Sequence, residues 1–463
     1  MAYATINPFT EEQLKVFPNT TPAEIETALA RGHAAFQTWK TAPIAQRTRI
    51  LQNAADILRA NLDDYAKLLT VEMGKLFAEA QAETELSAAI FEYYALNAER
   101  LLAAEILPVA SLKEGRAKIV FEPQGIILAI EPWNFPYYQV ARIAAPQLAT
   151  GNTVMLKHAS NVPQSAGLME KLMRDAGLPE GGFQNLYPTH EQLNIVIADP
   201  RVRGVALTGS EGAGAKVASE AGLALKKCTM ELGGSDAMIV LADADLEKTV
   251  KWAVFGRHWN GGQVCVSAKR MIVEDGIYDS FVERYRKGVA ALRMGDPMDP
   301  GTTLAPLSSR GAVDGLKQQV ADAVAHGAKA EEIPLEMPNK GCFFRPVLLS
   351  GVDEDNPARL WEFFGPVTML FRARDAEHAI AIANDSPYGL GGSIFTADEE
   401  RGAELARQID TGMVYVNHPT MVKADLPFGG VKRSGFGREL LGLGLKEFVN
   451  TKLIDIVGLD DPF

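Results

Sequence analysis

Strand and helix patterns alternate through the middle of the chain, and this alternation limits the possible folds more than any other feature. Residues 153–157 (TVMLK) and 202–207 are short apolar runs, and helical patterns follow at 163–176 and 212–221. Short apolar runs separated by helices are typical of parallel βαβ units. We therefore predict an α/β fold built on an open, doubly wound parallel sheet.

Two further regions complete this outline. After Asp236 the strand-like runs MIVL, KRMIV and VTMLF alternate with helical patterns at 278–292 and 311–326. The first hundred residues instead show helical periodicity, with a helix start at Thr21 and helical patterns over 44–73 and 78–102. A strand-like run follows at 117–130, and another closes the chain at 451–457.

Composition excludes several classes of protein. The chain has 463 residues, enough for two or three domains, and its 47% hydrophobic and 22% charged residues are those of an ordinary globular protein. The net charge of −12 argues against unspecific binding to nucleic acids. No secretory signal or long apolar window is visible, and three cysteines are too few for a disulfide framework. We therefore expect a soluble cytoplasmic protein that binds neither nucleic acid nor membrane.

Cys265 is the first candidate for chemistry. It follows two glycines in NGGQVCV (260–266), where the backbone can approach a ligand closely. The alternative is a buried, inert cysteine, which is the commoner fate of a free thiol. Cys228 and Cys342 lack such neighbours, so we expect both to pack in the core.

Two more candidates follow predicted strands. Glu231 ends an apolar strand before two glycines, and clefts in open α/β sheets lie at the carboxyl ends of strands. The alternative is a salt bridge at the strand end. The loop 131–136 (EPWNFP) is stiffened by two prolines, and a rigid loop suits an oxyanion donor. Taken alone, the loop is better interpreted as a structural loop with a core tryptophan.

The segment 207–214 (LTGSEGAG) combines a strand end, a glycine turn and a helix start. Free N–H groups at a helix amino terminus favour a phosphate. The segment is not the GxGxxG fingerprint, so by itself it is weak evidence.

Together these motifs resemble the aldehyde dehydrogenase superfamily over essentially the full length of the chain. In the family's order they are PWNFP (132–136), LKHAS (156–160), TGS (208–210), ELGG (231–234), GGQVC (261–265), EFFGPV (362–367) and PFGGVKRSGFGRE (427–439). The length and the KHAS and SGFGRE variants are most similar to NAD(P)-dependent succinate-semialdehyde dehydrogenases.

The resemblance implies an oxidation that passes through a cysteine thiohemiacetal and a thioester. Cys265 is then the nucleophile, Asn134 holds the oxyanion together with the Cys265 N–H, and Glu231 activates the hydrolytic water. At an ordinary pKa only about 3% of a thiol is thiolate at pH 7, so Cys265 needs activation. No metal is expected.

The cofactor implied is NADP, with NAD as the less favoured alternative. Many NAD-preferring members carry a glutamate three residues after Lys157, where this chain has Ser160. The alternative for Lys157 is a surface lysine at a strand end, and the alternative for Glu362 is a loop carboxylate without a function. The implied cofactor contacts are Ile130, Trp133, Lys157, Ala159, Ser160, Gly209, Ser210, Ala213, Leu232, Glu362 and Phe364.

A substrate with a distal carboxylate requires a cation in the aldehyde tunnel. Arg142 is eight residues after Asn134, about 12 Å of helical rise, and matches an arginine of similar enzymes; a salt-bridged surface arginine is the alternative. Those enzymes often have a second arginine where this chain has Trp259, so other side chains must assist. The predicted substrate contacts are Arg142, Trp133, His258 and Lys423, with Arg257 as a further candidate.

The resemblance also implies three structural parts and an oligomer. We assign residues 1–105 and 125–231 to a cofactor-binding domain, 232–440 to a catalytic domain, and 106–124 and 441–463 to a small β extension for oligomerisation. Because a free strand edge invites pairing with another chain, we expect a homodimer or homotetramer.

Other functions within the superfamily are possible from the sequence. An acylating enzyme that uses coenzyme A generally lacks a glutamate at the position of Glu231. A non-catalytic structural protein does not need Cys265, Glu231 and Asn134 together. A broad-range or other semialdehyde dehydrogenase remains the main alternative.

Overall fold

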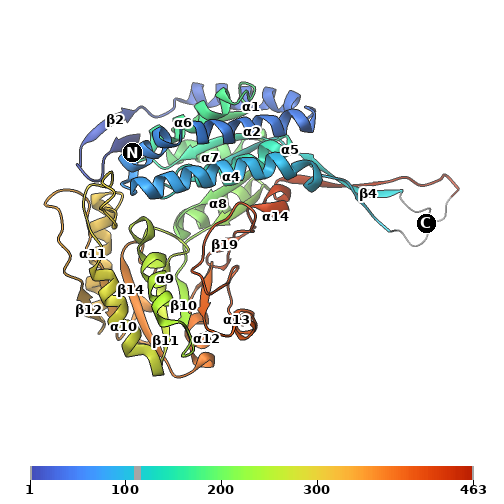
Figure 1. Ribbon diagram of the computed structural model, residues 1–463. Coiled ribbons are helices and arrows are strands. Elements are labelled where there is room, and N and C mark those ends of the chain that lie inside the picture. Colours follow the sequence, from blue (N-terminus) through green and yellow to red (C-terminus); the bar gives the residue numbers. More distant parts are fainter. Residues whose placement is uncertain (1–2, 109–115, 461–463) are drawn as a thin grey trace.

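The computed structural model describes residues 3–108 and 116–460. Figure 1 shows two lobes, each built on a mostly parallel sheet with helices against it, and a long narrow arm that leaves the first lobe. The predicted α/β fold is confirmed. No helix in the described ranges is long and apolar enough to cross a membrane.

The first lobe contains a six-stranded sheet in the order β19-β9-β8-β5-β6-β7. The strands are β5 (Ile126–Glu131), β6 (Thr153–His158), β7 (Phe183–Leu186), β8 (Val202–Thr208), β9 (Lys227–Glu231) and β19 (Gly435–Phe436). All neighbours are parallel except β19, which runs antiparallel to β9. Because β5 lies between β6 and β8, the order of strands reverses there, and ligands bind outside the carboxyl ends of strands at such a switch point.

Helices cover both faces of this sheet. They are α1 (Pro22–Trp39), α2 (Ile44–Ala60), α3 (Leu62–Met73), α4 (Phe77–Leu101), α5 (Tyr138–Thr150), α6 (Pro163–Asp175), α7 (His190–Ala198) and α8 (Glu211–Leu223). The pattern at 44–73, predicted as one helix, is two helices that meet at Asn61, whose backbone is not helical (φ −123°, ψ 30°). The hairpin of β1 (Tyr3–Ile6) and β2 (Gln13–Phe17) was not predicted, because β2 is almost entirely exposed and lacks an apolar face.

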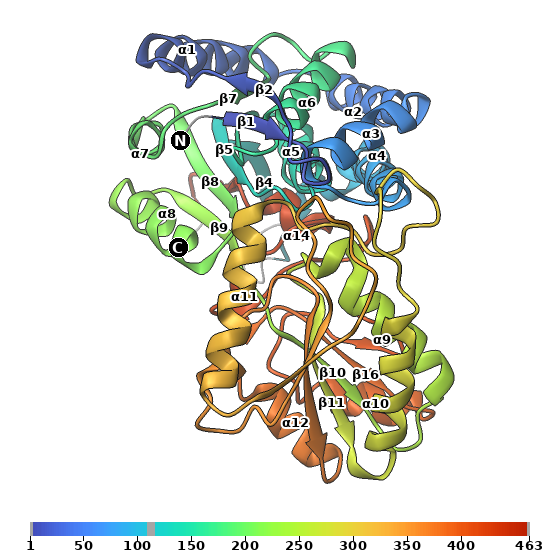
Figure 2. The ribbon, with the colours of Figure 1, turned by 90° about the vertical axis from the view of Figure 1, so that its left-hand side faces the viewer.

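The second lobe, seen from the side in Figure 2, contains a seven-stranded sheet in the order β12-β13-β14-β11-β10-β16-β17. Its strands are β10 (Asp236–Val240), β11 (Ala268–Glu274), β12 (Lys329–Glu332), β13 (Val347–Ser350), β14 (Val367–Ala373), β16 (Gly392–Phe395) and β17 (Tyr415–Val416). Its helices are α9 (Leu246–His258), α10 (Asp275–Ala290), α11 (Arg310–Ala325), α12 (Ala376–Asn384) and α13 (Glu399–Ala406). The three strand runs predicted after Asp236 are β10, β11 and β14.

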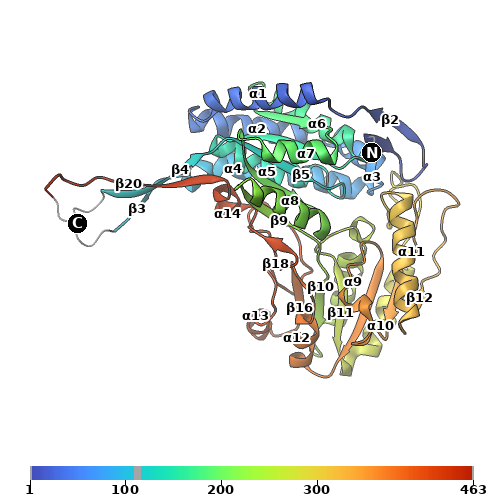
Figure 3. The same ribbon diagram turned by 180° about the vertical axis from the view of Figure 1, so that it is seen from behind.

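The arm is a three-stranded antiparallel sheet, which Figure 3 shows from behind. It contains β3 (Glu105–Ile106), β4 (Ala117–Pro123) and β20 (Val449–Asp455), and α14 (Leu441–Lys446) lies at its base. Of the predicted extension, residues 109–115 and 461–463 lie outside the described residues. One segment departs from the predicted division: β19, assigned to the catalytic domain, pairs with β9 of the first lobe.

Candidate active site

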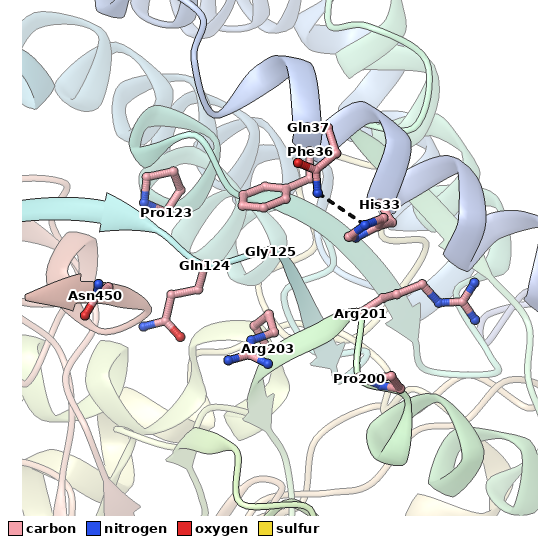
Figure 4. Close-up of a pocket in the computed structure, with 10 residues that line it drawn as sticks. All are labelled: His33, Phe36, Gln37, Pro123, Gln124, Gly125, Pro200, Arg201, Arg203 and Asn450. Carbon is pink, nitrogen blue, oxygen red and sulfur yellow. Dashed lines mark hydrogen bonds between the residues drawn. The ribbon is translucent and has the colours of Figure 1, made fainter.

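The carboxyl edge of the six-stranded sheet carries the candidate site. A cavity of about 590 Å³ opens at the opposite edge, where Gly125 precedes β5 and Arg201 and Arg203 lie at the start of β8 (Figure 4). Thr208 and Glu231, by contrast, end β8 and β9. Since ligands of open α/β sheets bind at the carboxyl ends of the strands, the cavity of Figure 4 is not the predicted site.

Cys265 lies in the loop between the short helix η1 (Trp259–Gly262) and β11. Gly261 and Gly262 have φ values of 63° and 76°, a conformation that glycine adopts without strain, and they turn the chain sharply before the cysteine. Gln263 stabilises the turn, because its side chain donates to the Asn260 carbonyl (3.1 Å) and accepts from the backbone N–H of Ser308 (2.9 Å). The position of the thiol is therefore set by the backbone.

The Cys265 side chain is half-buried, whereas Cys342 is buried as predicted and Cys228 is half-buried on β9. Burial raises the pKa of the Cys265 thiol to about 12, against the opposing influence of the cations Lys269 and Arg142. A thiol with such a pKa holds its proton at neutral pH, so its attack on a carbonyl requires a base.

Asn134 lies against the same loop. Its side-chain N–H₂ donates to the Gln263 carbonyl (3.0 Å), and its own backbone carbonyl accepts from the side chain of Asn260 (3.0 Å). An amide N–H₂ has two hydrogens, so one is still available to an oxyanion. The structure thus brings the predicted donor and the loop of the predicted nucleophile together.

Two carboxylates on α4 hold these two loops in place. Glu83 accepts hydrogen bonds from the backbone N–H groups of Tyr137 (2.8 Å) and Tyr138 (3.2 Å), directly after the PWNFP segment. Glu79, one turn earlier, accepts from the backbone N–H of Asn260 (2.9 Å), and burial raises its pKa to about 7. One helix therefore supports both walls of the site.

Glu231 is buried at the end of β9, and neither of its carboxyl oxygens has a hydrogen-bond partner in the described part of the chain. Burial, followed by the neighbouring Glu439, raises its pKa well above the usual range, while Arg142 acts in the opposite direction. Glu131 is buried in the same group of side chains and shows the same shift. No hydrogen bond between Glu231 and Cys265 is present among the described residues.

Arg142 is fully enclosed, with 1% of its surface exposed. Its guanidinium pairs with Glu439 and donates to the hydroxyls of Tyr138 (2.7 Å) and Thr208 (2.8 Å). This position speaks against the predicted contact with a substrate carboxylate, because the guanidinium is already paired with Glu439 and lies near the carboxyls of Glu231 and Glu131. Of the predicted alternative, a salt-bridged surface arginine, the salt bridge is present but the position at the surface is wrong.

The other predicted substrate contacts do not lie together in the structure. His258 is 4% exposed and lies beside Tyr285, and Arg257 is buried and donates to the carbonyls of Val367 and Phe363. Both therefore face the interior of the second lobe, which corrects their predicted role. Lys423 is exposed, and its neighbours Val422 and Ala424 pack against the same apolar core as Trp259 and Cys265.

The predicted cofactor residues surround the switch point. Ser210 caps the amino terminus of α8 by accepting from the N–H of Ala213 (3.4 Å), beside Gly209, and Leu232 packs on Gly214 of the same helix. The helix therefore presents free N–H groups at the carboxyl edge of β8, as a pyrophosphate requires.

Side chains at both ends of the proposed cofactor site suit the part of the cofactor expected there. Lys157, at the end of β6, is partly buried, and burial lowers its pKa; it has no ion-pair partner among the described residues. A cation of this kind fits a phosphate. Glu362 pairs with Lys269 (3.2 Å), and the rings of Trp133 and Phe364 meet edge to face at 5.7 Å. Ile130, Ala159 and Ser160 lie at or after the ends of β5 and β6.

Several groups at the site were not predicted: Lys269, Glu79, Glu83, Glu131 and Glu439. A weak signal existed for two of them, because Glu79 and Glu83 are four residues apart and face the same side of α4. Their partners lie far along the chain, and nothing local indicates them. No group of three or more His, Cys, Asp or Glu suited to a metal is found within the described ranges.

Comparison with known proteins identifies the family. The family model for the aldehyde dehydrogenase family matches residues 1–454. The chain is 47% identical to a succinate-semialdehyde dehydrogenase [NADP(+)] of Deinococcus radiodurans, with 98% of this chain and 94% of that protein covered. A Mycobacterium avium protein of the same name is 43% identical, with 98% and 96% covered. The crystal structure of a succinic semialdehyde dehydrogenase from Streptococcus pyogenes, in complex with NADP⁺, matches with a TM-score of 0.96 and 45% identity, covering 99% and 100% of the two chains.

The support from α4 gives a prediction about stability. Lys75 and Glu83 form an ion pair with both side chains 1% exposed. Glu83→Gln leaves the Lys75 ammonium buried without its counter-ion, so we expect a loss of about 3 to 5 kcal/mol in the free energy of unfolding. The Lys75→Met/Glu83→Gln double variant should lose less than the sum of the single losses. Chemical denaturation of the four proteins measures this coupling, and additive losses would contradict it.

Proposed function

Because the chain belongs to the aldehyde dehydrogenase family, we propose that it oxidises succinate semialdehyde to succinate with NADP as the hydride acceptor. The observation that carries the chemistry is the Asn134 amide hydrogen-bonded within the Cys265 loop. Substrate and cofactor are supported by relatives of that name at 43 to 47% identity. Formation of NADPH from succinate semialdehyde, with and without coenzyme A, tests this proposal against an acylating reaction.

The first half of the reaction is an attack by sulfur on the aldehyde carbon. As the carbon–sulfur bond forms, the half-buried Cys265 thiol passes its proton to water, which acts as the base, and the carbonyl oxygen becomes an oxyanion. The free Asn134 amide hydrogen and the Cys265 backbone N–H then stabilise this charge; loss of one such donor typically costs about 2.7 to 4 kcal/mol. NADP, when bound, accepts the hydride, and Cys265 is left as a thioester.

Hydrolysis of the thioester requires a base, and we assign Glu231 to this role. A carboxyl whose pKa is raised is a stronger base than an ordinary glutamate. To reach a water at Cys265, its side chain must turn away from Arg142 and Glu439. Arg142 and Glu439 remain paired with each other, so this movement leaves no unpaired guanidinium behind.

NADP is held, in this proposal, at three points. The free N–H groups at the start of α8, beside Gly209 and Ser210, take the pyrophosphate, Lys157 and Ser160 the ribose phosphate, and Glu362 the nicotinamide ribose. The helix start and the uncompensated cation described above support the first two assignments.

The arm supports an oligomer, and the cysteines support a reducing compartment. Among the residues that the structure describes, β20 and β3 flank β4 with no strand paired on their outer sides, so we propose a homodimer or homotetramer formed through the arm. The three cysteines are all unpaired, as in proteins of the cytoplasm.

Removal of the nucleophile should abolish the reaction. We expect Cys265→Ala to keep less than a few per cent of kcat, because no other cysteine lies in the site. Cys228→Ala and Cys342→Ala are the matched controls and should keep most of the activity. Steady-state NADPH formation compares the three variants. Substantial turnover by Cys265→Ala would exclude the covalent mechanism.

Replacement of the base should separate the two half-reactions. With Glu231→Gln we expect a rapid burst of NADPH followed by slow turnover, because thioester hydrolysis loses its base while hydride transfer is retained. Stopped-flow absorbance measures both phases. An equal loss in the burst and in the steady state would assign Glu231 to activation of the thiol instead.

Cofactor preference should depend on Ser160. A carboxylate about 4 Å from a phosphate costs roughly 4 kcal/mol per charge pair at an effective dielectric constant of 20, so Ser160→Glu should lower kcat/KM for NADP far more than for NAD. Ser160→Ala removes the hydroxyl without adding charge, so it should lower the NADP-to-NAD ratio of kcat/KM by less than Ser160→Glu does. A wild-type kcat/KM for NAD ten times that for NADP would contradict the preference.

Recognition of the substrate's distal carboxylate should depend on Lys423, whereas Arg142 should not act on that carboxylate selectively. Arg142→Met removes a buried counter-ion, so we expect equal losses of kcat/KM for succinate semialdehyde and butanal. Lys423→Met should lower kcat/KM for succinate semialdehyde alone, by up to about fivefold, as is typical of an exposed ion pair. A loss confined to succinate semialdehyde in Arg142→Met would restore the contact predicted from sequence.

A further inference from the structure

Lys269, four residues after Cys265, is a fully buried lysine that the proposed mechanism does not use. Its ammonium donates to the backbone carbonyls of Val264 and Cys265, both at 2.7 Å. It also forms an ion pair with Glu362 (3.2 Å). The side chain of Lys269 is 0% exposed and that of Glu362 is 18% exposed, so water screens this pair only weakly.

A purely structural cap on two carbonyls does not need a charge. A buried ammonium carries a large desolvation penalty, and here burial lowers the pKa of Lys269. Two carboxylates, Glu362 and Asp236, oppose this effect and favour the charged form of Lys269. Asp236 accepts from the backbone N–H of Gly391 (3.0 Å), and Glu362 accepts from that of Gly234 (3.1 Å), so both are fixed in place.

We propose that Lys269 is a positioning residue that holds the Cys265 backbone and sets how readily its thiol ionises, and that Glu362 limits this effect. The proposal deepens the proposed function, since it rests on Cys265 as the nucleophile. When the thiol loses its proton, negative charge appears next to the ammonium, which stabilises it. Glu362 compensates part of the ammonium's charge and so opposes thiolate formation.

Charged groups of both signs face Cys265, and they act on its thiol in opposite directions. Lys269 and Arg142 favour the thiolate, whereas Glu362 and Asp236 disfavour it, and Tyr138 is a further ionisable neighbour. Arg142 is itself compensated by Glu439, so it is less able to respond to the thiol. Opposite effects are therefore expected from removing Lys269 and from removing Glu362.

Alkylation of Cys265 by iodoacetamide tests this without aldehyde or cofactor. The test requires the full-length Cys228→Ala/Cys342→Ala protein, in which Cys265 is the one remaining thiol, and the rate of alkylation is to be measured between pH 7.5 and 9.5. Lys269→Met should slow alkylation about 3- to 10-fold, since a rise of one pKa unit removes tenfold of the thiolate but makes the rest more nucleophilic. Glu362→Gln should accelerate it by a similar factor.

Lys226→Met is the matched control, because Lys226 also caps two backbone carbonyls, those of Ile197 and Asp199, in the other lobe. It should leave the rate at the parent value. Changes of the same sign in Lys269→Met and Glu362→Gln, or an unchanged rate in Lys269→Met, would overturn the proposal. If circular dichroism shows that Lys269→Met does not fold, Glu362→Gln decides alone, and a rate equal to or below the parent's refutes the role.

This experiment is independent of the proposed reaction. Substantial dehydrogenase turnover by Cys265→Ala would remove the proposed mechanism but leave the alkylation rates as measured. Normal turnover with unchanged alkylation rates would remove only the role of Lys269.

Discussion

The ion pair between Arg142 and Glu439 joins the parts of the molecule that make the site. Arg142 lies on α5 of the first lobe, while Glu439 belongs to the segment that returns from the second lobe and exchanges backbone hydrogen bonds with Phe428. The guanidinium also packs over the Phe428 ring at 4.6 Å. Because a buried charge is tolerated only with its counter-ion, the return of the chain to β9 is tied to this pair.

The same pair determines the protonation of its neighbours. Glu131 and Glu231 share the space around Arg142, but one guanidinium cannot compensate three carboxylates in a dry interior. Glu439 takes the direct contact, yet burial raises the pKa of all three carboxyls, and that of Glu131 and Glu231 well above the usual range. The raised pKa of Glu231 is thus a consequence of burial and charge balance and not of a special hydrogen bond.

Much of the fold could be predicted from sequence because it depends on local patterns. The runs at 153–157 and 202–207 are β6 and β8, and the helical pattern at 163–176 is α6. Motif residues such as Ser210 and Glu231 gather at one edge because each follows a parallel strand. The break at Asn61 has no proline or glycine to indicate it, and the helical pattern simply continues past it.

The supporting charges could not be predicted for a different reason. The sequence around Arg142 is similar to that of an arginine in the aldehyde tunnel. Only the folded chain shows that its guanidinium N–H groups are already bound by Glu439 and Thr208. Glu83 and Lys269 likewise bind backbone groups, which no side-chain motif encodes.

The protonation of the site has a consequence for the thiol itself. Thiolates react with oxidants and electrophiles far faster than thiols do. At Cys265 burial outweighs the two nearby cations and raises the pKa of the thiol, and at Glu231 burial and Glu439 outweigh Arg142 and raise the pKa of the carboxyl. Burial therefore opposes ionisation of both the nucleophile and its base, and a movement of either group or a change in the local charge alters this balance. The residues that control the local charge, Arg142 and Lys269, are fixed by contacts to both lobes and to the Cys265 backbone. Reactivity is thus coupled to the intact fold, because disruption of either lobe removes a cation from the vicinity of the sulfur.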